Sequence, residues 1–248
     1  MSVKLTLIRN VKWLFIRFRL HILTEPFSSF FSTLANLSKL SRWVSINRNI
    51  PFNDFYSPRW DYNKRYRLYE YIFRKKSLDG EIVYLEFGVS GGHSFQWWVK
   101  ANTHPGSKFF GFDTFEGLPE DWGGFKKGAM TTGAQVPDMN DARVVFCKGL
   151  FQETLPGFLK NLDKSRKKVI MMDADMYSST LYTLTSLAPY LIPGDIILFD
   201  QFNVPMHEFL AFQNFISSYY LKFELLGAAN NYYFCAFELN NSFREIIV

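Results

Sequence analysis

The sequence lacks paired cysteines and long apolar runs. Its two cysteines, Cys147 and Cys235, lie far apart and in no C-x-x-C pair. We therefore expect neither a disulfide framework nor a zinc site, and a reducing cytoplasm is the simplest setting. No segment approaches the roughly 20 uncharged apolar residues that a membrane-spanning helix needs. Arginine and lysine interrupt every apolar run near the N-terminus, so no signal peptide is expected.

Acidic residues are scarce in the first fifth of the chain. Residues 1–50 hold eight Lys and Arg against one acid, Glu25. Because the whole chain carries +5 and this segment carries +7, the remainder carries −2. The basic character therefore belongs to one extension, and a general nucleic-acid-binding surface is not expected. A length of 248 residues with 48% hydrophobic content suits one α/β domain with a large core plus this extension.

The extension begins with an amphipathic pattern. Apolar residues recur at helical spacing, with basic residues outside the stripe, and a helix is predicted to end before Pro26. The stripe consists of Leu7, Ile8, Val11, Leu14, Phe15, Phe18 and Ile22. Residues 3–23 could lie on an anionic membrane surface, at the inner face, or they could pack on the core or on a second copy in a homodimer. We divide the chain into this extension (1–50), a helical lead-in (51–80) and a catalytic domain (81–248).

From residue 82 onward, predicted strands and helices alternate, which is typical of an α/β domain. The hairpin signal at 227–231 indicates that an antiparallel pair closes an otherwise parallel sheet of seven strands, with helices on both faces. The strands are predicted at 82–87, 108–112, 143–147, 168–172, 196–199, 222–226 and 232–237. The helices are predicted at 61–76, 93–101, 153–162, 178–191 and 206–220.

The first chemical signal is a strand that ends in an acid and a glycine-rich turn, residues 84–92. A second apolar run ends in Asp113, at nearly the spacing of a nucleoside-binding βαβ unit. A carboxylate there can accept hydrogen bonds from ribose hydroxyls. The turn lacks the full G-x-G-x-x-G spacing of a pyrophosphate site, so S-adenosylmethionine fits better than NAD. Glycines that merely pack a helix on a strand would give the same pattern.

The connection 114–141 is far longer than usual and predicts a lid or binding loop, with Trp122 placed to cover a ligand.

A second chemical signal lies after the apolar run 169–172, which delivers two acids to a strand end. Asp173 could meet Asp200 from the next strand and hold Mg²⁺, while Asp175 stays able to take a proton. Helix capping by these acids is the plain alternative. His207 could reach the substrate side.

Five motifs occur in order at 86–92, 112–119, 148–156, 173–180 and 193–200. In this order they resemble the macrocin O-methyltransferase family, class I S-adenosylmethionine-dependent enzymes with a Rossmann-like fold that methylate sugar hydroxyls. The resemblance covers roughly residues 60 to 240.

The resemblance implies a role for each motif. It places the methionine end of S-adenosylmethionine at Glu86, Gly88 and the turn of Ser90, Gly91 and Gly92. It places the ribose at Asp113 and its neighbour Thr114, and the adenine at Gly149 and Leu150. It also implies Mg²⁺ on Asp173 and Asp200, with Asp175 as the base. The family commonly carries a second acid where this chain has Gln201, so a weakened or absent metal is expected. The acceptor would be a small molecule or a glycan.

Two other function classes stay open from the sequence. The turn Gly88-Val89-Ser90-Gly91-Gly92 satisfies G-x-S-x-G, and an acid and His207 follow in the chain order of an α/β-hydrolase triad. The basic and aromatic segment before this turn weighs against a hydrolase. A methyltransferase-like fold without catalysis is the other alternative, with Gln201 as a sign of lost activity.

Overall fold

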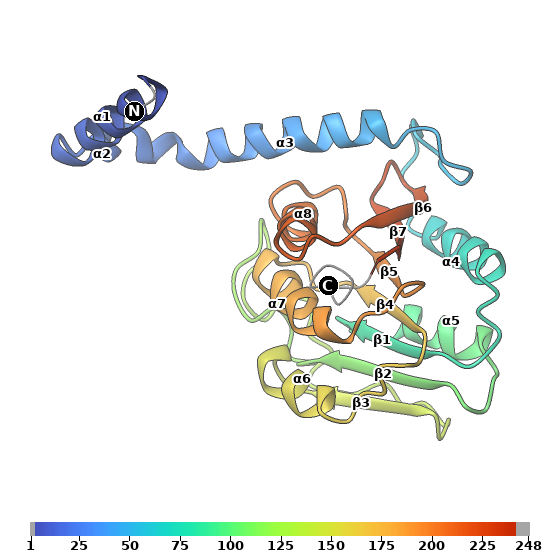
Figure 1. The fold of residues 1–248 in the computed structure, drawn as a ribbon. Coiled ribbons are helices and arrows are strands. Elements are labelled where there is room, and N and C mark those ends of the chain that lie inside the picture. The colour runs from blue at the N-terminus through green and yellow to red at the C-terminus, as the bar shows by residue number, and fades with distance from the viewer. Residues whose placement is uncertain (1–2, 242–248) are drawn as a thin grey trace.

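The computed structural model describes residues 3–241 and forms a seven-stranded sheet in the order β3-β2-β1-β4-β5-β7-β6 (Figure 1). Strand β7 runs antiparallel to both neighbours, and the pairs among β1 to β5 are all parallel. The predicted Rossmann-like α/β fold with a C-terminal hairpin is confirmed. The strands are β1 (Val83–Phe87), β2 (Lys108–Asp113), β3 (Val144–Lys148), β4 (Lys168–Met172), β5 (Ile196–Phe199), β6 (Phe223–Ala229) and β7 (Phe234–Leu239).

Helices cover both faces of the sheet, which explains why the sequence of β1 is apolar apart from Glu86. Leu85 and Phe87 join the core beneath α6, α7 and α8, while Tyr84 joins the core beneath α4 and α5. A strand that is buried on both faces has no polar side to alternate with. The helices are α4 (Lys64–Lys75), α5 (His93–Ala101), α6 (Phe151–Leu159), α7 (Tyr177–Leu187) with the short η2 (Ala188–Tyr190), and α8 (Glu208–Ser218).

The hairpin turn lies later than the sequence predicted. Strand β6 continues through Gly227 to Ala229, and the turn is made by residues 230–233. Gly227 sits at a register shift in the β6–β7 pair, where an added Cβ would lie 2.9 Å from Leu68 of α4. The glycine therefore serves a bulge and a close helix contact. Asn230, Asn231 and Tyr232 have the positive φ angles of the turn.

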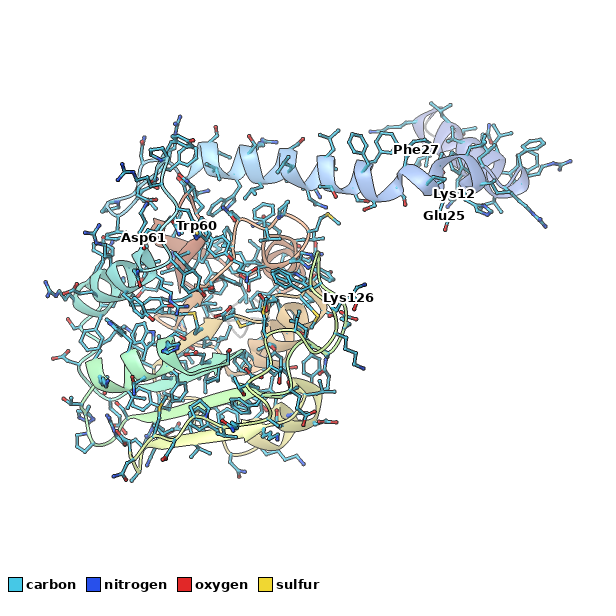
Figure 2. All side chains as sticks on the ribbon, turned by 180° about the vertical axis from the view of Figure 1, so that it is seen from behind. Lys12, Glu25, Phe27, Trp60, Asp61 and Lys126 are labelled. Carbon is cyan, nitrogen blue, oxygen red and sulfur yellow. The ribbon has the colours of Figure 1, made fainter. Side chains whose placement is uncertain are left out.

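The N-terminal extension is a series of helices rather than one helix that ends before Pro26, so that prediction is wrong. A break at residues 18–20, where Arg19 has φ +50°, ends the first helix. The helices are α1 (Val3–Arg17), α2 (His21–Thr24), η1 (Glu25–Phe27) and α3 (Ser28–Ile46). We call residues 3–35 the arm. Figure 2 shows Lys12, Glu25 and Phe27 at its far end, away from the sheet.

The second half of α3 fixes the arm to the domain. The Trp43 ring lies 4.9 Å from the ring of Phe202 and 6.0 Å from that of Phe237, in the core beneath α8. About two turns earlier, Asn36 is buried and donates to the sulfur of Met206 at 3.2 Å. Among residues 3–241, no helix is long and apolar enough to cross a membrane.

Candidate active site

A cleft of about 570 Å³ opens at the carboxyl ends of the parallel strands, where ligands bind in open α/β sheets. Its volume is that of a small-molecule site. Residues that follow each of β1 to β5 line it, and eight of the lining residues are predicted site residues. These are Gly88, Ser90, Asp113, Thr114, Leu150, Asp173, Asp175 and Gln201.

The glycine-rich turn is shaped by one close approach. Gly88 has φ +92°, and an added Cβ would lie 1.8 Å from the carbonyl oxygen of Asp173 at the end of β4. Only glycine fits where the ends of β1 and β4 pass so closely. Ser90 follows with φ +48° and lines the cleft, whereas Gly91 and Gly92 do not line it. Gly92, with φ +75°, begins α5.

Asp113 holds this turn in place. Its Oδ2 accepts hydrogen bonds from the backbone N–H groups of Val89 at 2.8 Å and Ser90 at 2.7 Å, and its Oδ1 accepts from Phe115 at 2.7 Å. A carboxylate offers about four lone-pair sites, so about one remains for a ribose hydroxyl. The backbone N–H of Gly149 donates to the Asp113 carbonyl at 3.0 Å, which brings Leu150 to the cleft wall.

Glu86 lies beneath the turn rather than in the cleft. It is fully buried, and its carboxylate accepts hydrogen bonds from Ser94 at 2.6 Å and from Tyr84. Burial raises the pKa of Glu86 to about 7, although these hydrogen bonds oppose the shift. Glu86 is therefore not placed to contact the methionine end of S-adenosylmethionine, as the resemblance implied. It fixes the start of α5 from below.

Asp175 combines backbone strain, burial and exposure to the cleft. It has φ +57°, it is 8% exposed, and it lines the cleft. Burial first, and then the charge of Asp200, raises the pKa of Asp175 to about 6, against a hydrogen bond donated by Nε2 of Gln201. Burial, and then the charges of Asp200 and Asp175, raise the pKa of Asp173 well above its usual range. Strained, titration-shifted acids in a cleft are typical of catalytic positions.

Two residues that the sequence analysis did not single out complete the site. Tyr62 donates to Oδ2 of Asp200 at 2.8 Å, and the Arg65 guanidinium lies 3.4 Å from Oδ1. Asp200 is 1% exposed, so this is a buried ion pair. The guanidinium carbon also lies 4.2 Å from the centre of the Tyr62 ring. The sequence signal that could have indicated this pair is Arg65 between Tyr62 and Tyr66 at the start of α4.

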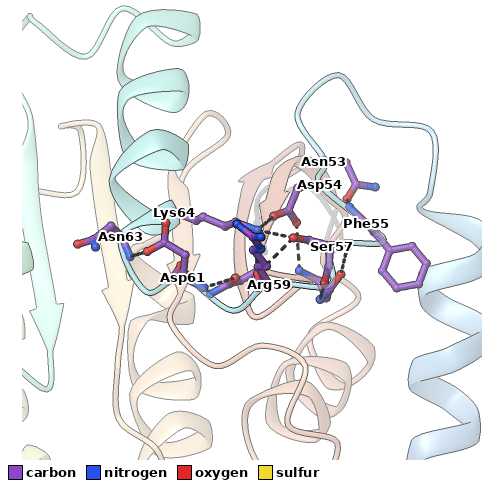
Figure 3. A network of polar contacts seen from close by, with 10 residues as sticks. Asn53, Asp54, Phe55, Ser57, Arg59, Asp61, Asn63 and Lys64 are labelled. Carbon is purple, nitrogen blue, oxygen red and sulfur yellow. Dashed lines mark hydrogen bonds and ion pairs between the residues drawn. The ribbon is translucent and has the colours of Figure 1, made fainter.

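The segment before α4 fixes these two residues. Lys64 donates to Asp54 at 2.6 Å and to Ser57 at 2.7 Å, which closes the segment into a compact network (Figure 3). The side chain of Asn230 in the β6–β7 turn donates to the carbonyl oxygen of Asp61 at 2.9 Å. Trp60 packs edge-on against Tyr233, with ring centres 4.5 Å apart. The lead-in is therefore part of the site's construction.

The residues predicted to hold Mg²⁺ do not fit that ion. The Asp200 oxygens are taken by Tyr62 and Arg65, and the guanidinium already supplies positive charge there. Gln201 turns its amide N–H₂ toward Asp175, and its buried Oε1 has no partner. One neutral oxygen and Asp173 make a poor set for a cation that prefers several oxygen ligands. Within residues 3–241, no three acids, histidines or cysteines are grouped to hold a metal.

His207 and Trp122 pack against each other outside the cleft. Neither lines the cleft, and their ring centres lie 5.9 Å apart. Burial lowers the pKa of His207, so the imidazole is neutral near pH 7. The prediction that Trp122 covers the ligand is wrong. The connection 114–141 instead lines the cleft through Thr114, Gly117, Leu118, Pro119, Glu120 and Met130.

The strand order and the ligand cleft define a class I methyltransferase fold, and comparison with known proteins agrees. Residues 85–202 match a family model described as a methyltransferase domain. The chain therefore contains a methyltransferase domain, and the predicted resemblance to sugar O-methyltransferases is supported by its relatives.

A curated relative is the 8-demethyl-8-(2,3-dimethoxy-alpha-L-rhamnosyl)-tetracenomycin-C 4'-O-methyltransferase of Streptomyces olivaceus. It is 38% identical over 64 residues, and the match spans 26% of this chain and 23% of the relative's length. The crystal structure of the calicheamicin methyltransferase CalS11 aligns with a TM-score of 0.56 at 18% identity, over 83% of this chain and 91% of that one. The O-methyltransferase NovP aligns with a TM-score of 0.51 at 19% identity, over 73% and 79%. These two structures support the fold.

Proposed function

We propose that the protein is an S-adenosylmethionine-dependent O-methyltransferase that acts on a hydroxyl group of a sugar or a glycosylated small molecule. One observation carries this proposal: Asp175 is a strained acid with its pKa raised to about 6, and it lines the same cleft as the glycine turn and Asp113. The family match and the rhamnose-modifying relative supply the reaction class.

The cleft suits a cationic cosubstrate. Asp113, Asp173 and Asp175 line it, and the nearest guanidinium, that of Arg65, is committed to Asp200. A positive sulfonium group is attracted to such a site, and the attraction is strong because the acids are poorly solvated. Gly88 and Ser90 would let the backbone approach the cosubstrate, and Leu150 would border its adenine. The cosubstrate supplies an activated methyl group.

The chain's own residues handle the proton. The acceptor oxygen forms a bond to the methyl carbon as the carbon–sulfur bond breaks, its electron pair stays on sulfur, and the hydroxyl proton passes to Asp175. Gln201 holds Oδ1 of Asp175, which leaves Oδ2 to take the proton. The raised pKa makes this carboxylate a better base than an ordinary aspartate while it remains ionised at pH 7. Most of the remaining acceleration comes from proximity of the two substrates.

We propose that this transfer proceeds without Mg²⁺, because Arg65 and Gln201 stand where cation ligands would be needed. Methyl transfer should then continue undiminished in EDTA. A loss of activity that added Mg²⁺ restores would contradict this part of the proposal and leave the methyl-transfer assignment standing.

The central test is Asp175→Asn. Asparagine tolerates the positive φ of this position and keeps the side-chain shape. We expect transfer of labelled methyl groups to TDP-rhamnose or a rhamnosyl glycoside to fall by about 10²- to 10⁴-fold, the usual contribution of a general base. Binding of S-adenosylhomocysteine, measured by calorimetry, should stay within a few-fold of the parent. Activity that survives the substitution would refute the base assignment.

Calorimetry on the parent chain also separates the alternatives. A scaffold without catalysis need not bind S-adenosylhomocysteine, so failure to bind would favour the non-enzymatic reading. The hydrolase reading loses support because β1 is the first strand of the sheet in residues 3–241, and a hydrolase elbow needs several strands before it. A role for His207 in catalysis, a homodimer and a cytoplasmic location stay predictions from the sequence.

A further inference from the structure

The arm exposes many large apolar side chains that no other part of residues 3–241 covers. Along α1 and α2, the side chains of the stripe predicted from the sequence are all exposed, from 41% for Phe15 to 63% for Leu7 and Ile22. The surface continues onto the first half of α3. The further exposed apolar residues there and at the α2–α3 junction are Leu23, Phe27, Phe30, Phe31 and Leu34. A soluble monomer rarely exposes so large a contiguous apolar patch without a partner.

The polar side of the arm is almost purely basic. Residues 3–35 hold Lys4, Arg9, Lys12, Arg17 and Arg19, and Glu25 is their one acid. The Arg17 guanidinium lies 4.8 Å from the centre of the Trp13 ring, so a cation and an interfacial aromatic lie together. A helix with a stripe of Leu, Ile and Phe and with cations outside that stripe is typical of segments that lie in the plane of an anionic membrane.

The same charges argue against a second copy of the chain as the partner. Two arms that met through their stripes would bring two equally basic segments together, and like charges at an interface oppose association. An anionic lipid surface complements them instead. Residues 51–248 carry a net charge of −2, so the lipid surface would attract the N-terminal extension and not the domain that follows it.

We propose that the arm is a peripheral membrane anchor that binds the surface of an anionic bilayer, with the stripe in the acyl boundary and the cations at the headgroups. The second half of α3, which packs on the domain through Trp43, would then hold the domain at the surface. The domain, and its cleft with it, is then held close to a membrane surface. This inference does not depend on the methyl-transfer proposal, because it uses no cleft residue.

The test is flotation of the full chain with vesicles. We expect recovery with phosphatidylcholine vesicles that contain phosphatidylglycerol, little recovery with phosphatidylcholine alone, and release at high salt. Neutralising Lys12 and Arg17 to glutamine should weaken binding by roughly fivefold for each cation removed. Equal recovery with both vesicle types, or none with either, would overturn the proposal.

A pair of matched variants separates insertion from charge. Leu14→Glu with Phe18→Glu puts two acids on the stripe, and Thr6→Glu with Asn10→Glu adds the same charge outside it. We expect the stripe variant to lose binding by at least about tenfold more than the control variant, because only the first loses apolar contact with the acyl region. Light scattering should find a monomer at all concentrations. A dimer that the stripe variant dissociates would overturn the proposal in favour of a second copy. An unchanged far-UV circular dichroism spectrum and an unchanged urea unfolding midpoint in each variant serve as the check on folding.

Discussion

Asp175 and Gln201 form the pair on which the proposed chemistry depends. Burial and the charge of Asp200 raise the pKa of Asp175, and the Gln201 hydrogen bond lowers it, so the value near 6 is a balance of the two. An aspartate with its usual pKa would be ionised but weakly basic at pH 7, whereas one shifted much further would be protonated and inactive. The amide of Gln201, in place of a second acid, therefore keeps the pKa of Asp175 in the range where the carboxylate is both ionised and basic at pH 7.

The first prediction follows from that balance. Methyl transfer should fall about tenfold for each pH unit below about 6, because a protonated Asp175 cannot accept the hydroxyl proton. Gln201→Leu removes the hydrogen bond that stabilises the carboxylate, so this fall should begin at a higher pH. The measurement is kcat/KM against pH for both proteins. An unmoved acidic limit in the variant would show that another group controls it.

Gly88 gives a second prediction at this scale. Gly88→Ala places a Cβ against the Asp173 carbonyl and should cost about 3 kcal/mol or more of unfolding free energy, together with S-adenosylhomocysteine binding. Gly194→Ala is the matched control, since Gly194 has φ +90° but no atom within 4 Å of an added Cβ. Chemical denaturation measures both. Equal losses in the two variants would mean that the positive φ, and not the close approach, explains Gly88.

Helix α4 and the segment before it bring a cation to the end of β5. The Lys64, Asp54 and Ser57 network orders the chain ahead of α4, and Arg65 then reaches Asp200 inside the core. A buried carboxylate is costly unless it is paired. The ordering of residues 51–63 thus stabilises the acid cluster as well as the fold. Figure 3 shows how many short polar contacts this segment makes.

The third prediction removes that cation. Arg65→Met should destabilise the fold by about 3–5 kcal/mol, because Asp200 is left buried without its partner. The double variant Arg65→Met with Asp200→Asn should recover most of this loss, since no buried charge remains. Urea unfolding of the parent, both single variants and the double variant measures the coupling. Additive effects in the double variant would show that the pair does not interact.

Across the whole molecule, several buried carboxyl groups have raised pKa values. Burial raises the pKa of Glu86 to about 7 and that of Asp195 to about 6, although Lys168 opposes the second shift from 3.3 Å. The folded protein therefore binds more protons than the unfolded chain between about pH 4 and pH 7. The contribution of these groups to stability is fully present in mild acid and is lost as the pH rises through these values.

The fourth prediction tests this linkage. The unfolding free energy should decline from pH 5 to pH 8, and the shift of Glu86 alone accounts for about 3 kcal/mol of that decline. Glu86→Gln keeps an oxygen acceptor for Ser94 but cannot ionise, so its stability should vary less with pH. Denaturant titrations across this range provide the measurement. A parallel decline in both proteins would assign the effect to other groups.

The strands of the domain and the parallel character of most of the sheet followed largely from the sequence. Apolar runs that are buried on both faces, each ending in a polar turn, predicted the parallel strands and the edge where Asp113 and Asp173 gather. The turn was predicted too early, at Gly227, because the sequence does not distinguish a glycine at a strand bulge from a glycine in a turn. The break at Arg19 was missed since the apolar spacing continues through it to Ile22.

Local spacing by itself determined which residues lie at the carboxyl ends of the strands, because the period of a strand and the short connections leave few choices. Only the tertiary structure decided which of them face the cleft. Glu86 turned into the core, and Arg65 came from a helix 135 positions away in the chain to pair with Asp200. Pairings of this kind depend on how helices pack across the sheet, which the residue order does not encode locally. The same holds for the arm, whose stripe is legible in the sequence but whose exposure is set by where α3 leaves the domain.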